Sequence, residues 1–401
     1  MQVAVVGAGI IGLTIAHRLA GEGHAVTLIA PAEEPHHAST GNAGTIASYA
    51  LDPVGTPEVL RDLPRLLFNR DSPLAIHRPS ALSLVPWLAR FLRQSLPGRA
   101  QANRAALAVE LAGAEADWRA LARAVGGEAL LNDRGAVYAF DTVQAMQRAA
   151  PGLLRRRSMG AAVELLDAGA LQALEPGLPQ GRFAGGALFP GTIWLSDPVQ
   201  MLARIAAATG AERVNARVTG LAPQGAGWRL HLDLGAPLEA EAVVLAAGAW
   251  SAGVLRPLGI RVPLTAERGY HLEFDGVSPL TRPVCPVSRG FYFTPMQGRL
   301  RAAGTVELGG IGAPPSPHRW ARLEEGVRSV FAGLPPVSRR WMGLRPSIPD
   351  SLPVIGMARK GLVLAFGHGH LGLTLAPRTA DLVLRALGGE APLAALDPAR
   401  F

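Results

Sequence analysis

The residues with the clearest chemical meaning near the amino terminus are the glycines of Gly7-Ala8-Gly9-Ile10-Ile11-Gly12. They follow a predicted strand, Gln2–Val6, and open a predicted helix, Ile10–Gly21. In such a strand–turn–helix unit the first glycine makes a tight turn, the second lets the backbone approach a diphosphate, and the third lets helix and strand pack closely. The amino end of the helix then presents unpaired N–H groups and a positive dipole end to the phosphates. The segment therefore predicts a dinucleotide site.

The acid that usually holds a ribose hydroxyl is missing from its expected place. It should end the second strand, about 20 residues after the glycine turn, but the predicted strand His24–Ile29 is followed by Ala30. No arginine occurs between Arg18 and Arg61, which disfavours a bound 2′-phosphate and therefore NADP. The groups that could take the place of the acid are Glu33, Glu34, His36, Ser39 and a backbone group.

Other parts of the sequence predict an α/β unit that brackets an antiparallel one. The apolar run Ala242–Ala247 is typical of a parallel strand covered on both faces, whereas Trp228–Leu234 alternates as a half-buried antiparallel strand does. Asp197 is expected to cap a helix that starts at Pro198. Further strands are expected over Gly135–Phe140, Gly186–Phe189, Arg268–Phe274, Phe291–Thr294, Arg299–Thr305 and Leu362–Phe366, and further helices over Leu82–Ala124, interrupted at Pro86 and Pro97, and over Leu371–Leu387.

Composition narrows the class of protein. The chain has 401 residues, 49% of them hydrophobic and 17% charged, which excludes intrinsic disorder and allows two or three domains. The net charge of +8 raises the question of a nucleic-acid partner. The arginines are scattered, apart from Arg155-Arg156-Arg157, so we expect no such partner. Cys285 is the single cysteine, which excludes a disulfide and a thiolate metal cage.

The sequence also predicts where the protein resides. No apolar run reaches the roughly 18 residues of a membrane span, and the first residues enter a strand without room for a signal peptide. We therefore expect a cytoplasmic protein. The segment Leu84–Leu96 has the pattern of a basic amphipathic helix, which either packs on the protein or lies peripherally on the inner face of an anionic membrane.

Five segments besides the glycine turn carry a recognisable pattern. They are Ala38–Gly44, Val243–Ser251, Glu267–His271, Gly343–Asp350 with Pro353–Gly356 after it, and Gly367–Thr374. Together they resemble the D-amino-acid oxidase/dehydrogenase family of FAD flavoproteins over essentially the whole chain. That family includes D-amino acid dehydrogenase, glycine oxidase, sarcosine oxidase and bacterial hydroxyproline dehydrogenases. The chain looks most similar to the D-amino acid and D-hydroxyproline dehydrogenases.

The resemblance implies an α/β fold in which a Rossmann-type FAD-binding domain is interleaved with an α+β substrate domain built on an antiparallel sheet. We expect residues 1–80, 141–225 and 335–401 in the first domain and residues 81–140 and 226–334 in the second. FAD should be held non-covalently, because the segment where sarcosine-oxidase relatives anchor flavin contains no cysteine here. The expected cofactor contacts are Gly7, Gly9, Ile10, Ile11, Gly12, Asn42, Ala43, Gly44, Val218, Ala247, Gly248, Trp250, Gly343, Gly367, His368, Gly369, His370, Leu371, Gly372, Leu373 and Thr374.

Three residues are expected to bind or enclose the substrate. The resemblance implies that Arg345 holds a carboxylate, which a guanidinium does through two parallel charge-assisted bonds. The alternative for Arg345 is a structural ion pair with Asp350, close in sequence. Tyr270 and Tyr292, two of four tyrosines, could donate to a carboxylate or pack in the core. Tyr270 and His271 alternate on one strand, so only one can face the site, and we favour Tyr270.

His368 and His370 flank Gly369 at the start of the last predicted helix. The family places this turn against the flavin, where a helix amino terminus would stabilise negative charge. Both histidines are candidate catalytic residues, and each could instead support the site by packing. We expect no metal there, because no carboxylate or thiol is their neighbour in sequence, and we assign no general base.

The predicted reaction is FAD-dependent oxidative deamination of D-amino acids, by hydride transfer from the α-carbon to flavin N5. A cyclic D-imino acid such as D-proline or hydroxy-D-proline is favoured, with electrons passed to a quinone or another acceptor. The first alternative is a glycine/sarcosine-type oxidase that uses O2 and releases H2O2. The second is a non-catalytic FAD-binding accessory subunit.

Overall fold

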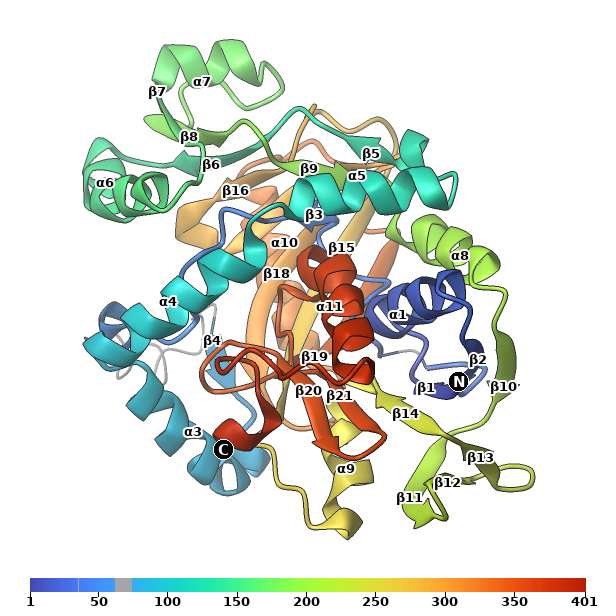
Figure 1. The fold of residues 1–401 in the computed structure, drawn as a ribbon. Helices are drawn as coiled ribbons and strands as arrows, with labels where there is room; N and C mark the ends of the chain where they lie inside the picture. The colour runs from blue at the N-terminus through green and yellow to red at the C-terminus, as the bar shows by residue number, and fades with distance from the viewer. Residues whose placement is uncertain (35, 62–73) are drawn as a thin grey trace.

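The amino-terminal strand lies in the middle of a six-stranded sheet. The computed structural model describes residues 1–34, 36–61 and 74–401 (Figure 1). All strand pairs in this sheet are parallel except β20 with β21. The order is β10 (Glu212–Asn215), β2 (Ala25–Ala30), β1 (Gln2–Val6), β14 (Ala242–Leu245), β21 (Leu362–Phe366) and β20 (Val354–Arg359).

Both faces of this sheet are buried, as the continuous apolar runs predict. Val3 and Val5 join one hydrophobic cluster and Ala4 and Val6 join another, so alternate side chains of β1 enter different cores. The first face is covered by α1 (Ile10–Gly21), α8 (Pro198–Ala208) and α11 (Gly372–Leu387). The second is covered by α9 (Ser251–Leu255) and the small sheet of β11 (Val218–Gln224), β12 (Gly227–Leu232) and β13 (Leu238–Ala240).

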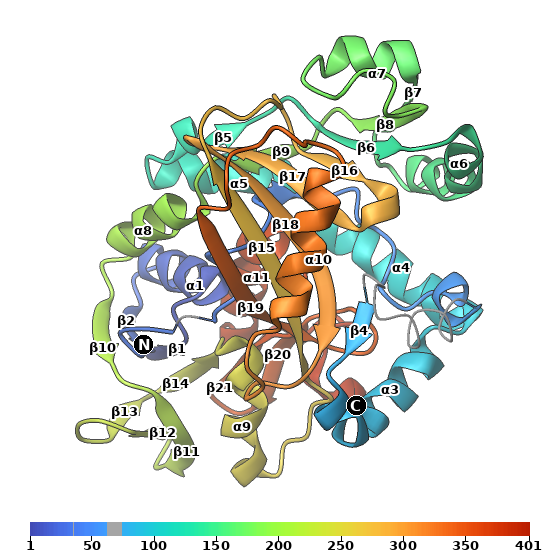
Figure 2. The same ribbon diagram turned by 180° about the vertical axis from the view of Figure 1, so that it is seen from behind.

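A larger sheet of nine strands forms the other half of the molecule. Helix α10 (Pro317–Arg328) packs on one of its faces through Leu323 and Val327, as Figure 2 shows. The order is β19 (Arg339–Ser347), β15 (Thr265–Asp275), β18 (Arg299–Leu308), β17 (Phe291–Met296), β16 (Val284–Pro286), β6 (Ala136–Phe140), β8 (Gly185–Phe189) and β7 (Glu164–Asp167), with β4 (Leu74–Ile76) beside β18.

Helices from the middle of the sequence surround the two sheets. Pro97 starts α4, as expected of a residue without an N–H group, whereas Pro86 lies within α3. Trp118 of α5 is fully buried and donates to the Leu373 carbonyl at 2.8 Å, which ties α5 to α11. These helices are α3 (Ala81–Gln94), α4 (Pro97–Leu111), α5 (Ala114–Ala124), α6 (Val143–Ser158) and α7 (Ala168–Leu174), and a third small sheet contains β3 (Thr45–Ile46), β9 (Ile193–Leu195) and β5 (Leu131–Asn132).

The predicted elements are present, and the Asp197 carboxylate caps α8 by accepting from the N–H groups of Val199 and Gln200. Sheet membership departs from the predicted domain boundaries, however. Strand β14 belongs to the six-stranded sheet, whereas β7, β8 and β19 belong to the nine-stranded sheet. The chain crosses between the two sheets more often than the predicted boundaries allow, because these crossings leave no change in amino-acid composition. The division into a cofactor domain and a substrate domain stays a prediction.

Candidate active site

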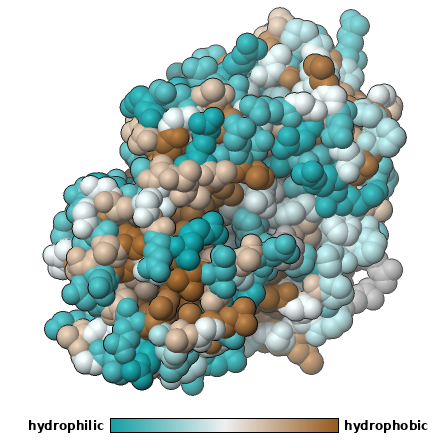
Figure 3. Space-filling model, turned by 90° about the vertical axis from the view of Figure 1, so that its right-hand side faces the viewer, coloured by the Kyte–Doolittle hydropathy of each residue, from teal (hydrophilic) through white to brown (hydrophobic). Residues whose placement is uncertain are grey.

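A cavity of about 460 Å³ lies where the two sheets meet. Its walls come from the carboxyl ends of β1, β2 and β14, the start of α11, and strand β19. The molecular surface is hollowed on the side of β2 and β10, with hydrophobic residues along the hollow (Figure 3). Ligands of open α/β sheets bind at the carboxyl ends of the strands, so this cavity is the candidate site.

The glycine turn forms the floor of the cavity at the amino terminus of α1. Gly7 has a φ of +112°, and a Cβ there would lie 2.4 Å from the Ala246 carbonyl oxygen. A Cβ on Gly12 would lie 1.8 Å from the Gly7 carbonyl oxygen. A Cβ on Gly9 would meet only the Ser39 hydroxyl, at 3.1 Å. The protein itself therefore requires glycine at positions 7 and 12, whereas Gly9 leaves its space to the cavity.

A loop after β2 continues the wall of the cavity and holds its own shape. The Asn42 side chain donates to the Ser39 carbonyl at 2.6 Å and accepts from the Gly44 N–H at 2.7 Å. The Ser39 hydroxyl accepts from the Ile10 N–H at 2.9 Å, which joins the loop to α1. Asn42 lines the cavity, while Gly44 packs against the Leu195 carbonyl.

One face of the nine-stranded sheet points toward the cavity, and strand register identifies it. Trp341, His271, Ala303 and Tyr292 are paired in a row across β19, β15, β18 and β17, and directly paired residues share a face. Trp341 lines the cavity. Arg345 lies on the same face as Trp341, since alternate residues of a strand point the same way.

Arg345 places a cation in the cavity, with the Glu267 carboxylate nearby on the neighbouring strand β15. Its guanidinium occupies the space that a side chain at Gly269 would fill. It donates to the Thr305 carbonyl at 3.1 Å. Within residues 1–34, 36–61 and 74–401 no carboxylate forms an ion pair with it. Asp350, the alternative partner, pairs with Arg400 at 3.0 Å. Burial lowers the pKa of Arg345, and the nearby Glu267 carboxylate opposes that shift.

Tyr270 faces away from the cavity, contrary to the prediction. Its hydroxyl donates to Glu307 at 2.6 Å and accepts from the Ser316 N–H at 3.1 Å, and its ring packs edge-on against Trp320 of α10. His271 occupies the cavity-facing side, stacked on Trp341. Alternation showed that the two residues face opposite sides, but only the position of α10 decides which side is which.

Tyr292 belongs to a cluster of three tyrosines on the cavity-facing side of the sheet. Its hydroxyl lies 2.9 Å from that of Tyr49, and its ring is 6.3 Å from that of Tyr138. Burial raises the pKa of Tyr292 well above its usual value, so the phenol stays protonated and can donate. Arg156 of α6 lies over the Tyr138 ring and pairs with Asp52 at 2.9 Å.

The two histidines of the last turn have different environments. The His368 ring is buried and lies 2.9 Å from the Thr379 hydroxyl. His370 is exposed within the cavity near Arg345. Burial lowers the pKa of His368 to about 3. The His370 ring is open to the cavity space but enclosed by the cavity walls, and desolvation there, together with the Arg345 charge, lowers its pKa to about 4. Both rings are therefore neutral at pH 7.

Comparison with known proteins identifies the fold and the cofactor. The model of the "FAD dependent oxidoreductase" (DAO) family matches residues 2–386. The chain belongs to the DAO family of FAD-dependent oxidoreductases. It is 35% identical to a D-amino-acid oxidase of Bradyrhizobium diazoefficiens, over 100% of this chain and 99% of the relative. It is 33% identical to a D-amino acid dehydrogenase of Cereibacter sphaeroides, over 98% of this chain and 93% of the relative.

Solved structures agree on the DAO fold. Glycine oxidase from Geobacillus kaustophilus superposes with a TM-score of 0.76 at 24% identity, covering 100% of this chain and 99% of that one. The interleaved α/β architecture expected from the sequence is confirmed by this likeness. As a member of the DAO family, the protein is an oxidoreductase, and its cofactor is FAD.

The cavity fits FAD, and it sorts the predicted contacts into two groups. A first group lines the cavity: Gly7, Gly9, Ile10, Ile11, Asn42, Val218, Ala247, Gly248, Trp250, His368, Gly369, His370, Gly372 and Leu373. A second group lies behind that lining: Gly12, Ala43, Gly44, Gly343, Gly367, Leu371 and Thr374. Thr374 accepts from the Ala47 N–H at 2.9 Å, and Gly343 lies under the Trp341 ring. Members of the second group shape the wall.

Trp341 is the cavity residue that sequence reasoning missed. Its indole occupies the space that side chains at Gly41 and Gly343 would fill, so two glycines distant in sequence were the signal for it. The Trp341 indole N–H and the His37 Nδ1 are buried at the cavity without a partner among the described residues. Unpaired buried polar atoms are costly, which supports a polar ligand in this space.

Cys285 lies away from the FAD cavity. It is on β16, where it pairs in register with Tyr138 of β6, and it is buried. Desolvation raises the pKa of its thiol to about 12, so it carries no thiolate near neutral pH. The single cysteine of the chain is therefore not placed to bond the flavin, in agreement with the predicted non-covalent cofactor.

Proposed function

We propose that this DAO-family oxidoreductase oxidises D-amino acids to imino acids, which water then hydrolyses. The observation that carries the proposal is Arg345, a cation in the FAD cavity without an ion-pair partner among the described residues. A carboxylate supplies the missing charge and matches the guanidinium geometry through two parallel hydrogen bonds. The D configuration is supported by the names of the oxidase and dehydrogenase relatives.

The residues around Arg345 have complementary tasks in this proposal. Bound FAD supplies the electron sink. Arg345 holds the substrate carboxylate, and the protonated Tyr292 hydroxyl, on the same face of the sheet, donates to it. The amino terminus of α11 at the cavity favours negative charge that develops there. His370 stays neutral near Arg345, so it does not compete for the carboxylate.

Replacement of Arg345 by lysine tests the proposal directly. Lysine keeps the charge but loses the paired geometry, so KM for a D-amino acid should rise about 10- to 100-fold while FAD stays bound. The matched control is Arg385→Lys on α11, where the exposed arginine pairs with Glu390 beyond the helix end, and it should leave KM unchanged. An unchanged KM in Arg345→Lys would refute the carboxylate role.

The substrate class proposed within this reaction is a cyclic D-imino acid such as D-proline or hydroxy-D-proline. The turn with His368 and His370 supports it, because it resembles proline-type dehydrogenases of the family. Anaerobic bleaching of the flavin by D- and L-amino acids, glycine, sarcosine and both prolines measures the preference. Faster bleaching by acyclic D-amino acids would move the assignment to those. A flavin that none of these compounds bleaches would support the accessory-subunit alternative.

The acceptor proposed for the electrons is a quinone or another carrier. Relatives divide on this point, since one is named an oxidase and others dehydrogenases. O2 uptake and quinone-analogue reduction should be compared on one enzyme preparation with the same D-amino acid. Fast reduction of the quinone analogue with slow H2O2 release is the expected result. Rapid H2O2 release would favour the oxidase.

We propose a peripheral membrane contact through the outer face of α3, which fits a quinone acceptor. The inner residues Leu84, Trp87 and Phe91 are buried, as the packed-helix alternative predicted. The outer face nevertheless exposes Leu82 (87%), Val85 (54%) and Leu92 (38%), and Leu96 (50%) is exposed just beyond it, before α4. Arg90 and Arg93 are exposed on the same helix, and no Asp or Glu occurs from Pro79 to Val109.

Apolar side chains flanked by arginines suit an anionic lipid surface. No helix in residues 1–34, 36–61 and 74–401 combines the length and hydropathy needed to cross a bilayer. Flotation with phosphatidylglycerol vesicles should carry the wild type upward. Leu82→Glu should remain at the bottom, and Val277→Glu, at a distant valine that is 99% exposed, should float. Equal flotation of both variants would exclude α3 as the contact.

A further inference from the structure

Ala30 leaves the ribose end of the FAD cavity without the acid that βαβ nucleotide sites normally place there. Ala30 ends β2 and lines the cavity, and its methyl group accepts no hydrogen bond. The ribose of a bound dinucleotide carries hydroxyl donors, which need acceptors once they are removed from water. Another group of this chain has to supply them.

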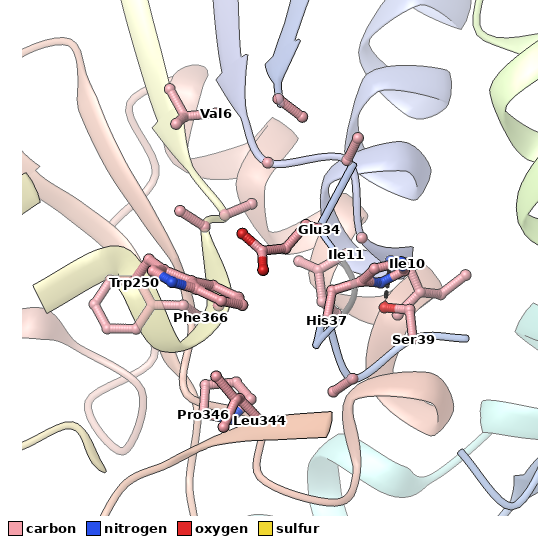
Figure 4. Close-up of a pocket in the computed structure, with 18 of the residues that line it drawn as sticks. Val6, Ile10, Ile11, Glu34, His37, Ser39, Trp250, Leu344, Pro346 and Phe366 are labelled. Carbon is pink, nitrogen blue, oxygen red and sulfur yellow. Dashed lines mark hydrogen bonds between the residues drawn. The ribbon is translucent and has the colours of Figure 1, made fainter. Parts of the chain in front are cut away.

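Glu34 is the acid that reaches this part of the cavity. It lies four residues after Ala30, and its carboxylate points into the cavity (Figure 4). The other candidates are engaged or turned away. Ser39 accepts from the Ile10 N–H, His36 Nδ1 lies 3.1 Å from the Met342 carbonyl, and Glu33 is exposed to solvent.

Arg217 holds the Glu34 carboxylate in place. Its guanidinium donates to Glu34 Oε2 at 2.8 Å. Arg217 follows β10, whose Asn215 pairs with Ala30 at the end of β2, and its backbone N–H donates to the Asp233 carboxylate at 2.7 Å. Glu34 Oε1 has no protein partner among the described residues, so this oxygen is available to accept from a ligand.

We propose that Glu34, oriented by Arg217, binds the ribose hydroxyls of the FAD adenosine in place of the missing strand-end acid. A carboxylate with one oxygen fixed and the other facing the cavity accepts from a 2′- or 3′-hydroxyl and repels a 2′-phosphate. Arg213 and Arg217 also line the cavity, so the absence of arginine between Arg18 and Arg61 does not by itself exclude a phosphate. The pairing of Arg217 with Glu34 disfavours a phosphate, because that guanidinium is already engaged by a carboxylate.

Cofactor affinity provides the first test, independent of which substrate the enzyme oxidises. The dissociation constant of FAD is measured from flavin fluorescence as the full-length holoenzyme is diluted. Glu34→Gln should raise it about tenfold or more, as expected for hydrogen bonds to a charged acceptor. Glu33→Gln, the adjacent exposed acid, is the matched control and should leave it unchanged. An unchanged dissociation constant in Glu34→Gln would overturn the proposal.

A second test separates a ribose contact from a purely structural ion pair. FAD-free protein is titrated with ADP, 2′-deoxy-ADP and 3′-deoxy-ADP in competition with FAD. The wild type should prefer ADP to at least one deoxy analogue by about tenfold, and this preference should vanish in Glu34→Gln and shrink in Arg217→Leu. If Glu34→Gln weakens the binding of all three ligands equally and the preference for ADP remains, the ion pair only stabilises the loop and the proposal is wrong.

Discussion

The two ends of the FAD cavity are built by different means. At the diphosphate end, glycines within residues 7–12 shape the backbone, and the limits are clearances between backbone atoms. At the proposed substrate end, Arg345 and His370 line the cavity from two separate segments, strand β19 and the turn before α11, and strand register puts Tyr292 on the same face of the sheet as Arg345. The first end is therefore encoded locally and the second by tertiary structure. Mutations at the two ends should therefore affect different properties, namely folding and FAD binding at the first and KM at the second.

The largest effect is expected from two substitutions in the glycine turn. One should destabilise the folded protein, and the other should weaken FAD binding. Gly12→Ala places a methyl group 1.8 Å from a backbone oxygen, which should lower the free energy of unfolding of FAD-free protein by about 3 kcal/mol or more. Gly9→Ala should leave that free energy nearly unchanged but weaken FAD binding. Urea unfolding and FAD titration measure the two quantities. Equal destabilisation by both variants would mean that the diphosphate end is not divided in this way.

A buried ion pair that connects the nine-stranded sheet to the Asn42 loop of the cavity should have the next largest effect. Arg301 of β18 pairs with Glu273 at 2.6 Å, both 2% exposed in their side chains, and donates to the Asn42 carbonyl at 2.8 Å. Glu273→Gln leaves Arg301 buried without its charge partner, which should lower the free energy of unfolding by about 3 kcal/mol. FAD affinity should fall too, because the Asn42 loop loosens. The isosteric shape of glutamine limits the change to charge.

The same pair predicts how stability depends on pH. Desolvation raises the pKa of the Glu273 carboxyl, but the Arg301 charge and the hydrogen bonds from Arg301 and Arg299 together outweigh it and lower that pKa from 4.5 to about 2. A carboxyl group whose folded pKa is depressed stabilises the fold above the unfolded pKa and loses this contribution as pH falls toward the folded value. Urea unfolding between pH 6 and 3 should therefore show a steeper loss below about pH 4.5 in the wild type than in Glu273→Gln. Parallel curves would contradict the assignment.

The smallest effect is expected from two tyrosines on opposite faces of the nine-stranded sheet. Tyr292→Phe should raise KM about threefold to tenfold, since one neutral hydrogen bond to substrate is lost. Tyr270→Phe should leave KM unchanged and lower the free energy of unfolding by about 1 kcal/mol. The Tyr270 hydroxyl donates to Glu307 and accepts from the Ser316 N–H, so its loss affects the fold rather than the substrate. Initial-rate kinetics and thermal unfolding measure the pair. A reversed pattern would restore Tyr270 to the cavity.

Sequence reasoning performed differently at these two ends for physical reasons. The glycine turn, the buried strand β14 and the Asp197 cap are local, and their positions follow from residues close in sequence. The face of Tyr270 depends on where α10 packs, and the position of Trp341 depends on space left by Gly41 and Gly343. Neither feature can be deduced from the residues close to it in sequence. Glu34 could be named only as one option, because its partner Arg217 lies 183 residues away.

The loop from His36 to Asn42 also ties the cofactor cavity to the other sheet. Its His36 carbonyl accepts from the Leu344 N–H at 2.8 Å, and its Gly41 carbonyl lies 3.0 Å from His271 Nδ1. A ligand that binds only the folded chain stabilises it by mass action. The lifetime of the enzyme in a cell should therefore follow the supply of riboflavin, because protein without flavin would open along this loop and reach proteases sooner. Pulse proteolysis with and without added FAD would register that difference as a cut between the two sheets.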